Sequence, residues 1–417
     1  MIQKPKGTKD VLPEESIKWR YTEAVADCIF SNYGFKEIRI PTFEYTELFE
    51  RGVGDTTDVV QKEMYTFEDK GGRSITLRPE GTAGIVRSYI ENGISSKPSP
   101  FKAMYCMPMF RYENVQKGRY REFNQIGAEI IGTQSYLADV ELISMAYKFL
   151  KELNLGDVIL TINSIGCPEC RKKYQEALKE FIGKNIEEYC STCKSRFEKN
   201  PMRILDCKEK RCKELNQGAP IILDYLCEEC KTHFENVKNA LDELNIEYEI
   251  DSSIVRGLDY YTKTVFEFIS KKDGYTVLAG GRYDGLVKEL GGPDTPAVGF
   301  AAGEERLLSL IPDEDINDLS TEVYITSMGE EYDLTAMKLA NDLRDNISVQ
   351  TNISSRSFNA QMKYANKINA LYTIVIGEDE VNNNKCKIKN MKNGEEIEIE
   401  LNADLISEKI IELEEDL

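Results

Sequence analysis

Histidine is nearly absent from this chain of 417 residues, which contains one, His233, and a single tryptophan. Catalytic triads with a histidine base and zinc hydrolysis at paired histidines are therefore excluded unless His233 itself serves. His233 follows a cysteine pair, and we expect it to be a surface residue of a helix rather than a ligand. The chemistry of the chain must rest mainly on arginine, carboxylate, amide and tyrosine groups.

Long apolar runs are also missing. No stretch approaches the length needed to cross a bilayer, and the first residues, MIQKPKGTKDVLPEE, lack the apolar core of a signal peptide. Eleven cysteines in such a chain favour reduced thiols or metal ligands in a reducing cytoplasm over disulfides. The net charge of -19 disfavours non-specific nucleic-acid binding over the whole surface, although a local basic groove is compatible with it.

The length exceeds one usual domain, and two patterns divide the chain. Residues 1–320 mix strand and helix patterns, with a cysteine-rich insertion at about residues 166–245 that we expect to be helical. Residues 321–417 alternate strand and helix, which predicts a small α/β domain with a mixed sheet. The acidic stretch IPDEDINDLST between them is predicted to be a linker.

Residues 107–132 have the pattern of two strands joined by a long polar loop. Gln125 and Glu129 share one face of the second strand because they are four residues apart. The hairpin also carries Arg111, Arg119 and Arg121. Guanidinium groups beside an amide and a carboxylate suit a ligand that carries phosphate and a positive or polar group. The alternative is a solvated hairpin whose arginines and glutamates pair with one another.

A second polar motif, TLRPEGT at residues 76–82, joins a predicted strand to a predicted helix. Glu80 and Thr82 would then lie near a helix N-terminus, where ligands commonly bind. A plain helix cap and turn would explain the same residues. Two further motifs, RGLDYY at residues 256–261 and GFAAGEERL at residues 299–307, flank a predicted hairpin and a glycine-rich bend.

Eight of the eleven cysteines fall in the insertion. They form three CxxC pairs and one looser pair: Cys167 with Cys170, Cys190 with Cys193, Cys227 with Cys230, and Cys207 with Cys212. These are enough for one or two tetrahedral Cys₄ sites, so we hypothesise structural zinc that stabilises an insertion with too small a core of its own. The alternative is a set of reduced, partly buried thiols. Cys28, Cys106 and Cys386 are expected to be core residues.

Three separated blocks resemble the motifs of class II aminoacyl-tRNA synthetases. FKEIRIP, ending at Pro41, resembles motif 1, MFRYE with its loop and second strand resembles motif 2, and GFAAGEERL resembles motif 3, with Arg306 as its arginine. TLRPEGT and RGLDYY are similar to motifs of the histidyl-tRNA synthetases in particular. The resemblance spans essentially the whole chain, and its C-terminal part is similar to an anticodon-binding domain.

The resemblance implies an α+β fold. A class II catalytic domain on an antiparallel sheet would span residues 1–320, interrupted by the helical insertion, and an α/β anticodon-binding domain would span residues 321–417. The implied activity is histidine–tRNA ligase: histidine and ATP, with Mg²⁺, give histidyl-adenylate and pyrophosphate, and histidine then passes to the 3′ end of tRNA(His). Such chemistry needs positioning and charge neutralisation more than a base. Motif 1 lies at a two-fold interface in this class, so a homodimer is expected.

The resemblance also implies residue roles. The catalytic groups would be Arg256 and Arg111, both near the α-phosphate; the alternative for Arg256 is a structural ion pair with Asp259 or another acid. The implied histidine-binding residues are Glu80, Gly81, Thr82, Arg111, Gln125, Glu129, Arg256, Tyr260 and Tyr261, with Glu129 and the tyrosines at the imidazole; one tyrosine could instead be a plain core residue. The implied ATP-binding residues are Arg111, Arg119 and Arg306. The implied tRNA contacts are Gln116, Lys117, Arg119 and Arg121, with Arg356 and Lys363, and this binding should weaken with salt.

This chain departs from the family pattern at two places. Asn114-Val115 stands where the family commonly has Arg-Pro, in a loop that approaches the acceptor end of tRNA, and Asn124 stands where histidine is usual. The other function class considered is a regulatory paralogue that binds histidine and controls its biosynthesis without aminoacylation. Such paralogues typically lack the anticodon domain and active-site residues, whereas RGLDYY, Arg306 and the C-terminal part are present here. A synthetase for another amino acid fits less well, because Glu129 and the tyrosine pair match the histidine family.

Overall fold

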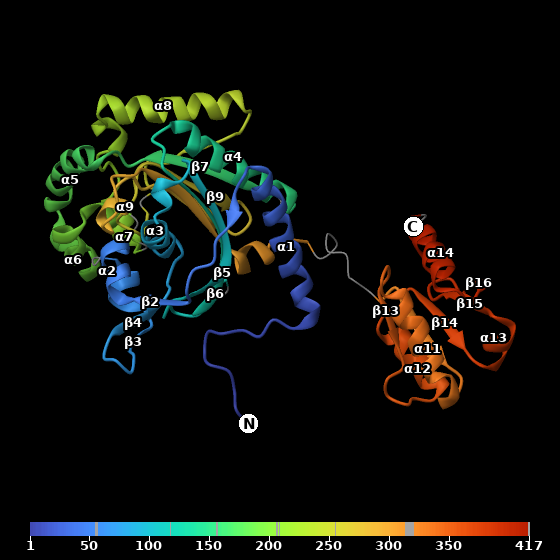
Figure 1. Cartoon of the computed structure of the whole chain (residues 1–417). Helices are drawn as coiled ribbons and strands as arrows, with labels where there is room; N and C mark the ends of the chain where they lie inside the picture. Colours follow the sequence, from blue (N-terminus) through green and yellow to red (C-terminus); the bar gives the residue numbers. More distant parts are fainter. Residues whose placement is uncertain are drawn as a thin grey trace. The chain divides into compact units, whose positions relative to one another are not determined.

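The computed structural model describes residues 1–54, 57–116, 118–155, 157–205, 207, 209–254, 256–312 and 321–415. The chain forms two compact units, Met1–Ile316 and Asn317–Leu417 (Figure 1). Most of the predicted linker, and with it the predicted boundary at residue 320, lies outside the described residues. Within the described ranges, no helix has both the length and the apolar character to cross a membrane.

The first unit is built on an eight-stranded sheet with the order β1-β5-β6-β11-β10-β9-β7-β8. Adjacent strands in this sheet are antiparallel except at its two edges, where β1 runs parallel to β5 and β8 runs parallel to β7. The antiparallel catalytic sheet expected from the sequence is therefore confirmed. The strands are β1 (Lys36–Glu37), β5 (Phe101–Phe110), β6 (Glu122–Ile131), β7 (Val158–Ser164), β8 (Glu249–Ile250), β9 (Thr262–Ser270), β10 (Thr276–Arg282) and β11 (Ala297–Gly303).

Two long helices, α1 (Pro13–Asn32) and α4 (Tyr136–Glu152), pack together against this sheet (Figure 1). A proline in the first turn and two acidic residues there favour the start of α1, because they complement the helix dipole. Phe30 of α1 meets Phe149 of α4 and Phe300 of β11 edge to face, with ring centroids 5.3 and 5.7 Å away. Cys28 is exposed on α1, so its predicted core position is wrong: the buried face of the helix carries Ala26, Ile29 and Phe30 instead.

A smaller sheet, with the order β2-β4-β3, lies beside helix α2. Of residues 35–43, which contain the FKEIRIP block, only Lys36–Glu37 (β1) and Phe43, the first residue of β2, pair in a sheet. Pro41 lacks an N–H to continue a ladder, and the Arg78 guanidinium takes the carbonyls of Ile40 (2.7 Å) and Pro41 (3.2 Å). The elements are β2 (Phe43–Tyr45), α2 (Thr46–Val53), a π-helix (Val59–Glu63), β3 (Thr66–Glu68), β4 (Ser74–Leu77), α3 (Thr82–Glu91), a 3₁₀ turn (Ile94–Ser96), α9 (Leu286–Glu289) and α10 (Glu304–Leu308).

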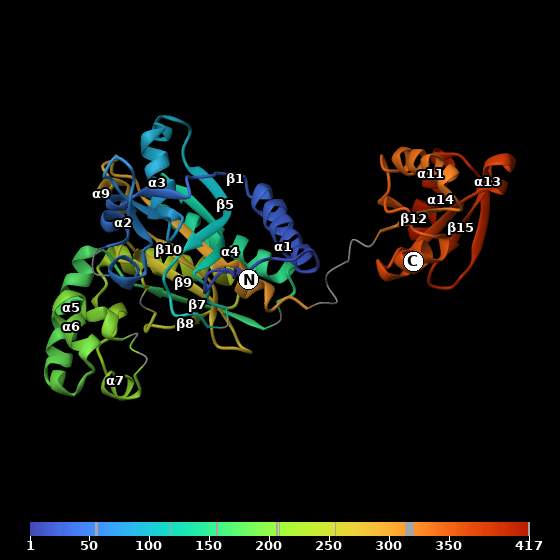
Figure 2. The same ribbon diagram turned by 90° about the horizontal axis from the view of Figure 1, so that it is seen from below.

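The cysteine-rich insertion is helical, as predicted, and α5, α6 and α7 gather at one end of the first unit (Figures 1 and 2). His233 lies on α8 but is buried, with 9% of its surface exposed, so its predicted surface position is wrong. The reason is that α8 packs along α4, where His233 Nε2 lies 3.4 Å from Asp139. The elements are α5 (Pro168–Gly183), α6 (Ser191–Lys199), α7 (Lys210–Leu215), α8 (Glu228–Glu243) and the 3₁₀ turns Ile186–Glu188, Pro201–Ile204 and Ile222–Tyr225.

The second unit is the predicted α/β domain with a mixed sheet, in the order β13-β12-β14-β15-β16. The first three strands are parallel, and β15 and β16 continue antiparallel. Leu343 and Ile410, from two of the helices, share a core with Ile325 and Ile374 of the sheet. The elements are β12 (Val323–Ser327), α11 (Glu330–Leu343), β13 (Val349–Thr351), α12 (Phe358–Lys367), β14 (Tyr372–Ile376), α13 (Glu378–Asn383), β15 (Lys385–Asn390), β16 (Glu396–Glu400) and α14 (Ala403–Glu415).

Candidate active site

A cavity of about 300 Å³ lies in the first unit where hairpin β5–β6, strands β10 and β11, the β4–α3 junction and residues 256–261 meet. This volume suits a small organic ligand. Gly81, Gln116, Arg121 and Glu129 are not in its lining, and Lys117 lies outside the described residues. The predicted residues that do line it are Glu80, Thr82, Arg111, Arg119, Gln125, Arg256, Tyr260, Tyr261 and Arg306.

Three arginines make one part of the cavity cationic. Arg111 donates from Nε to the carbonyl of Pro79 (2.7 Å), and Arg306 donates to the carbonyl of Thr276 (2.8 Å). The Glu113 carboxylate is shared, lying 3.8 Å from Arg111 and 3.4 Å from Arg119. Burial, followed by the charge of Arg119, lowers the pKa of Arg306. A bound anion would relieve this crowding of positive charge.

Arg256 supplies a fourth guanidinium to the cavity lining, and Glu267 of β9 holds it. The two form an ion pair, and the guanidinium carbon lies 5.3 Å from the centre of the Tyr261 ring. This is an ion pair of the kind given above as the alternative for Arg256, with Glu267 as the acid; Asp259 lies instead near Arg203 (3.7 Å). The Nε of Arg256 is buried and has no hydrogen-bond partner among the described residues. This donor is therefore left for a ligand in the cavity.

Glu80 both caps a helix and forms a wall of the cavity. Its carboxylate accepts from the backbone N–H of Thr82 (2.9 Å) and Ala83 (2.7 Å), at the start of α3. The hydroxyl of Tyr260 donates to the same carboxylate (3.4 Å). Burial raises the pKa of the Glu80 carboxyl. The capping explanation of this motif is thus correct for the backbone contacts, and it places the carboxylate at the ligand cavity.

Glu129 lies buried behind the lining of the cavity. It accepts from the hydroxyls of Thr82 (2.7 Å) and Tyr283, both of which line the cavity. Burial raises the pKa of its carboxyl to about 8, although these two hydrogen bonds act to lower it. Gly299 faces it on β11, where an added Cβ would lie 1.6 Å from a Glu129 oxygen. Only glycine at position 299 leaves room for this carboxylate.

Sequence reasoning missed two tyrosines of the site. Tyr283 belongs to GGRYDG, which was interpreted only as a glycine-rich bend, and Tyr105 lies just before the strand pattern identified at residues 107–132. The Tyr105 ring occupies space left by Gly81 and Gly127, where an added Cβ would lie 2.7 and 2.3 Å from it. The Tyr105 hydroxyl and Gln125 Oε1 are both buried without a hydrogen-bond partner among the described residues. A polar ligand is the natural partner for both atoms.

The raised pKa of Glu129 predicts a pH effect on stability. Between 4.5 and about 8 the folded protein holds a proton on this carboxyl that the unfolded chain has released, so the free energy of unfolding falls as pH rises through that window. The side chain in Glu129→Gln cannot ionise. We therefore expect the free energy of unfolding of this variant, measured by denaturant melts from pH 5 to 8.5, to fall less steeply with pH. Glu68→Gln, at an exposed position, is the control. Equal slopes for Glu129→Gln and the unaltered chain would contradict the prediction.

The remaining predicted contacts lie at the edge of the site or elsewhere. Gln116 and Arg119 pair through their backbones as an isolated antiparallel β-bridge in the hairpin loop. Arg121 stacks over the Tyr112 ring at 3.7 Å and donates to the carbonyl of Glu113 (3.3 Å). In the second unit, Arg356 stacks over Tyr364 at 4.1 Å, on the helix that also carries Lys363.

The eight insertion cysteines form two separate groups of four thiols. We call Cys167, Cys170, Cys227 and Cys230 the outer tetrad, and Cys190, Cys193, Cys207 and Cys212 the inner tetrad. Within each tetrad, one sulfur from every residue lies within 4.8 Å of the others. All eleven cysteines lie in the described part of the chain and are free thiols. Four thiols this close together suit zinc, which binds four cysteine sulfurs in a tetrahedron.

Comparison with known proteins agrees with this geometry. The family model Histidyl-tRNA synthetase matches residues 7–307, and the model Anticodon binding domain matches residues 322–412. A histidine–tRNA ligase of Clostridium botulinum (strain 657 / Type Ba4) is 55% identical over 96% of this chain and 97% of its own length. A histidine–tRNA ligase of Clostridium perfringens (strain SM101 / Type A) is 56% identical over 97% of this chain and 98% of its own length. The crystal structure of apo S. aureus histidyl-tRNA synthetase, 43% identical, matches with a TM-score of 0.83 over 98% of this chain and 100% of that one.

Proposed function

This chain belongs to the histidyl-tRNA synthetase family, and we propose that the cavity on its first unit is where histidine and ATP react. The chain is a histidine–tRNA ligase: it activates histidine with ATP, releases pyrophosphate and transfers histidine to tRNA. The observation that carries the site proposal is the composition of the cavity. Four guanidinium groups stand beside carboxylate, amide and phenol groups, some of which have buried atoms without a hydrogen-bond partner in the described part of the chain.

Histidine would occupy the carboxylate and tyrosine side of the cavity. Glu80, Thr82 and the unpartnered Oε1 of Gln125 are acceptors suited to an α-ammonium group. Tyr260 and Tyr261 line the cavity and Glu129 lies behind Thr82 and Tyr283 in its wall, so we assign the two imidazole nitrogens to these three residues, with Glu129 acting through the two hydroxyls. A buried site of this kind rejects amino acids that cannot fill its hydrogen bonds, by roughly 10⁴-fold or more. Tyr283 then acts by holding the Glu129 carboxylate in place.

ATP would occupy the arginine side. Arg111, Arg119 and Arg306 can bind its phosphates, and Arg256 faces the same cavity from residues 256–261. The histidine carboxylate attacks the α-phosphorus, an oxygen–phosphorus bond forms, and the bond to pyrophosphate breaks. Negative charge grows on the α-phosphate oxygens during this step, and guanidinium groups fixed beforehand stabilise it. Arg111 and Arg256 are therefore proposed as the catalytic residues.

The carboxylates beside these arginines fit Mg²⁺. Glu113 and Glu305 both line the cavity, and carboxylate oxygens together with ATP phosphates are the hard ligands that Mg²⁺ prefers. Glu305 accepts a hydrogen bond from the backbone N–H of Asn124 (2.8 Å), which fixes this carboxylate at the cavity. Bound Mg²⁺ would neutralise phosphate charge, while the chain's own arginines orient the α-phosphate.

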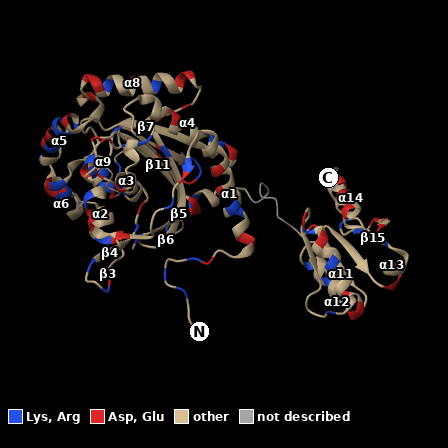
Figure 3. Ribbon diagram, in the orientation of Figure 1, with Lys and Arg blue, Asp and Glu red and all other residues tan. Residues whose placement is uncertain are grey.

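The macromolecular partners follow from the family. We propose that tRNA(His) approaches through the hairpin loop at Gln116, Lys117, Arg119 and Arg121, and through Arg356 and Lys363 of the second unit. Basic and acidic residues are interspersed on both units (Figure 3), so binding to tRNA must rely on such local groups.

A homodimer is supported by the small sheet, which exposes Phe43, Tyr45 and Phe67. Free thiols throughout support a reducing, cytoplasmic setting. The cysteine tetrads are proposed to hold structural zinc.

Pyrophosphate exchange into ATP, with each amino acid supplied separately, tests the activation step. We expect exchange with histidine alone, because Glu129 and the acceptors around Gln125 fit its imidazole and ammonium groups together. Exchange with a different amino acid would overturn the assignment of this pocket. Binding of histidine without any exchange would favour the regulatory class of protein instead.

A further inference from the structure

Three of the four cysteine pairs begin a helix. Cys167, Cys190 and Cys227 are the N-cap residues of α5, α6 and α8, and each is followed three positions later by a second cysteine in the first turn. The N-terminal dipole of a helix favours thiolate over thiol. Backbone N–H groups also donate to these sulfurs, from Cys227 to Cys170 (3.1 Å) and from Cys190 to Cys212 (3.4 Å). Such bonds orient and stabilise metal-binding thiolates.

The spacing of the sulfurs fits a single ion in each tetrad. Cys167 and Cys170 have sulfurs 3.5 Å apart, and Cys190 and Cys207 have sulfurs 3.9 Å apart. Zinc–sulfur bonds of about 2.3 Å in a tetrahedron place neighbouring sulfurs about 3.8 Å apart. Atoms within 4.8 Å of one another leave no room for an iron–sulfur cluster between them. The donor set and size therefore favour zinc.

The two tetrads are nested along the chain. The outer tetrad joins the first and last helices of the insertion, whereas the inner tetrad lies wholly between them. Lys263 and Arg171 lie close enough to the outer tetrad for the charges of Cys230 and Cys167 to act on them. Four thiolates around one Zn²⁺ leave a net negative charge, which these two cations offset.

Two cysteines of the inner tetrad lie on either side, in the sequence, of residues that contact the segment following Arg256. Asn200 and Arg203 lie between Cys193 and Cys207, two ligands of that tetrad. Asn200 Nδ2 donates to Asp259 (3.1 Å), and Arg203 donates to the carbonyl of Gly257. Both contacts fall on the segment between Arg256 and Tyr260. Fixing the ends of the 193–207 segment therefore fixes the support of this loop.

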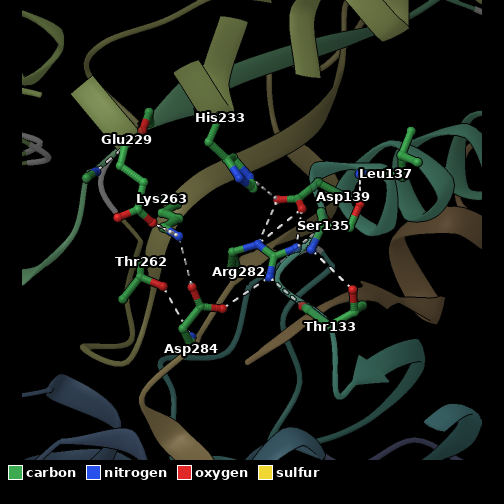
Figure 4. Close-up of polar contacts among 12 residues, drawn as sticks. Thr133, Ser135, Leu137, Asp139, Glu229, His233, Thr262, Lys263, Arg282 and Asp284 are labelled. Carbon is green, nitrogen blue, oxygen red and sulfur yellow. Dashed lines mark hydrogen bonds and ion pairs between the residues drawn. The ribbon is translucent and has the colours of Figure 1, made fainter. Parts of the chain in front are cut away.

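The outer tetrad holds the other end of the same segment. The N–H of Lys263 donates to the carbonyl of Gly166 (2.9 Å), next to Cys167, and the Lys263 ammonium pairs with Glu229 (2.9 Å), between Cys227 and Cys230. Figure 4 shows Glu229, Lys263 and Asp284 in one chain of polar contacts, beside His233, Asp139 and Arg282. Lys263 has a φ of 49°, a strained conformation for a residue other than glycine. Its contacts with Gly166 and Glu229, which are neighbours of outer-tetrad cysteines in the sequence, hold it there.

We propose that the insertion binds two zinc ions, one in each tetrad, and that the two ions together position residues 256–263, which carry Arg256, Tyr260 and Tyr261. The meaning of that segment for catalysis rests on the function proposed above; the two sites themselves do not. The cysteines are positioning groups, because they touch neither substrate nor reacting atoms. The insertion thereby serves histidine activation, in addition to its own stability.

Metal analysis and pyrophosphate exchange on the full-length chain test the proposal. We expect two zinc ions and no iron per chain, and one zinc in Cys193→Ser (inner tetrad) or Cys230→Ser (outer tetrad). Each variant should lose up to about 10²-fold in kcat/KM for histidine, since small misplacements of a site cost this much. Cys28→Ser, an exposed cysteine outside both tetrads, should retain two zinc ions and full exchange.

A second pair of variants separates positioning from collapse of the insertion. Arg203→Lys and Glu229→Gln leave every cysteine in place, so both should keep two zinc ions and yet reproduce part of the loss in kcat/KM. Fewer than two zinc ions, with the thiols of one tetrad all reactive, would overturn the two-site proposal. Two zinc ions whose removal leaves kcat and KM for histidine unchanged would overturn the positioning role. Two zinc ions in a chain without histidine-dependent exchange would contradict the proposed function and leave the sites standing.

Discussion

Replacing Arg256 with alanine is expected to lower kcat for histidine-dependent pyrophosphate exchange by ~10²–10³, the usual loss for one preorganised charge at a reacting centre. Its side chain lines the cavity, and its buried Nε has no hydrogen-bond partner within the described ranges, so an α-phosphate bound there would meet this charge directly. Arg256→Lys should retain part of the activity, because it keeps the charge but loses the planar donors. Steady-state exchange with varied histidine and ATP measures both variants.

Arg256→Ala also leaves Glu267 without its ion-pair partner, which could unfold the site by itself, since breaking a buried pair typically costs about 3–5 kcal/mol. The control is Arg256→Met combined with Glu267→Gln, which keeps the volume and leaves no unpaired carboxylate. We expect this double variant to melt close to the unaltered chain and still to be inactive in exchange. A folded double variant with near-normal kcat would show that Arg256 is only a structural ion-pair residue.

Gly299→Ala is expected to reduce kcat/KM for histidine by about 10²-fold, chiefly through KM, because a catalytic group displaced by about 1 Å can cost that much. The added methyl would lie 1.6 Å from a Glu129 oxygen, so the carboxylate must leave its hydrogen bonds with Thr82 and Tyr283. The KM for ATP should change far less, since the proposed phosphate-binding arginines are held by other residues, namely Pro79, Glu113 and Thr276. Exchange kinetics with each substrate varied in turn give the two values.

The matched control for Gly299→Ala is Gly285→Ala. An added Cβ at position 285 would meet no atom within 4 Å, and that residue is not part of the cavity lining. We expect unchanged KM values for both substrates in this control. If Gly299→Ala behaved like Gly285→Ala, Glu129 would not be the group that recognises the histidine side chain.

Local patterns were enough for much of the architecture. Alternation around residues 107–132 and the turn residues between its strands predicted hairpin β5–β6, and the resemblance placed Glu80, Gln125 and Arg256, which the fold brings into one cavity. Periodicity succeeded where neighbours in sequence are also neighbours in space. Strand pairing is interrupted between Glu37 and Phe43, where Arg78, far along the chain, binds the carbonyls of Ile40 and Pro41.

Long-range packing accounts for the other misses. His233 is buried because α8 lies along α4, a contact that the sequence around residue 233 does not encode. Tyr283 gains its importance from Glu129, on a strand more than a hundred residues earlier. The grouping of cysteines is similar: spacing indicated metal ligands, but only the fold shows that Cys167 and Cys170 are joined by Cys227 and Cys230 rather than by the nearer pair.

The position of β11 in the sheet has a consequence for how the chain is made. β6 pairs with β11, so the edge of the β5–β6 hairpin stays open while the ribosome adds the residues in between. A gap of roughly 170 residues takes roughly ten to thirty seconds at bacterial elongation rates. Throughout that time an apolar strand edge is exposed on the nascent chain and can pair with other chains. Slower elongation or scarce chaperones should thus reduce the soluble yield of this protein before any effect on the finished enzyme.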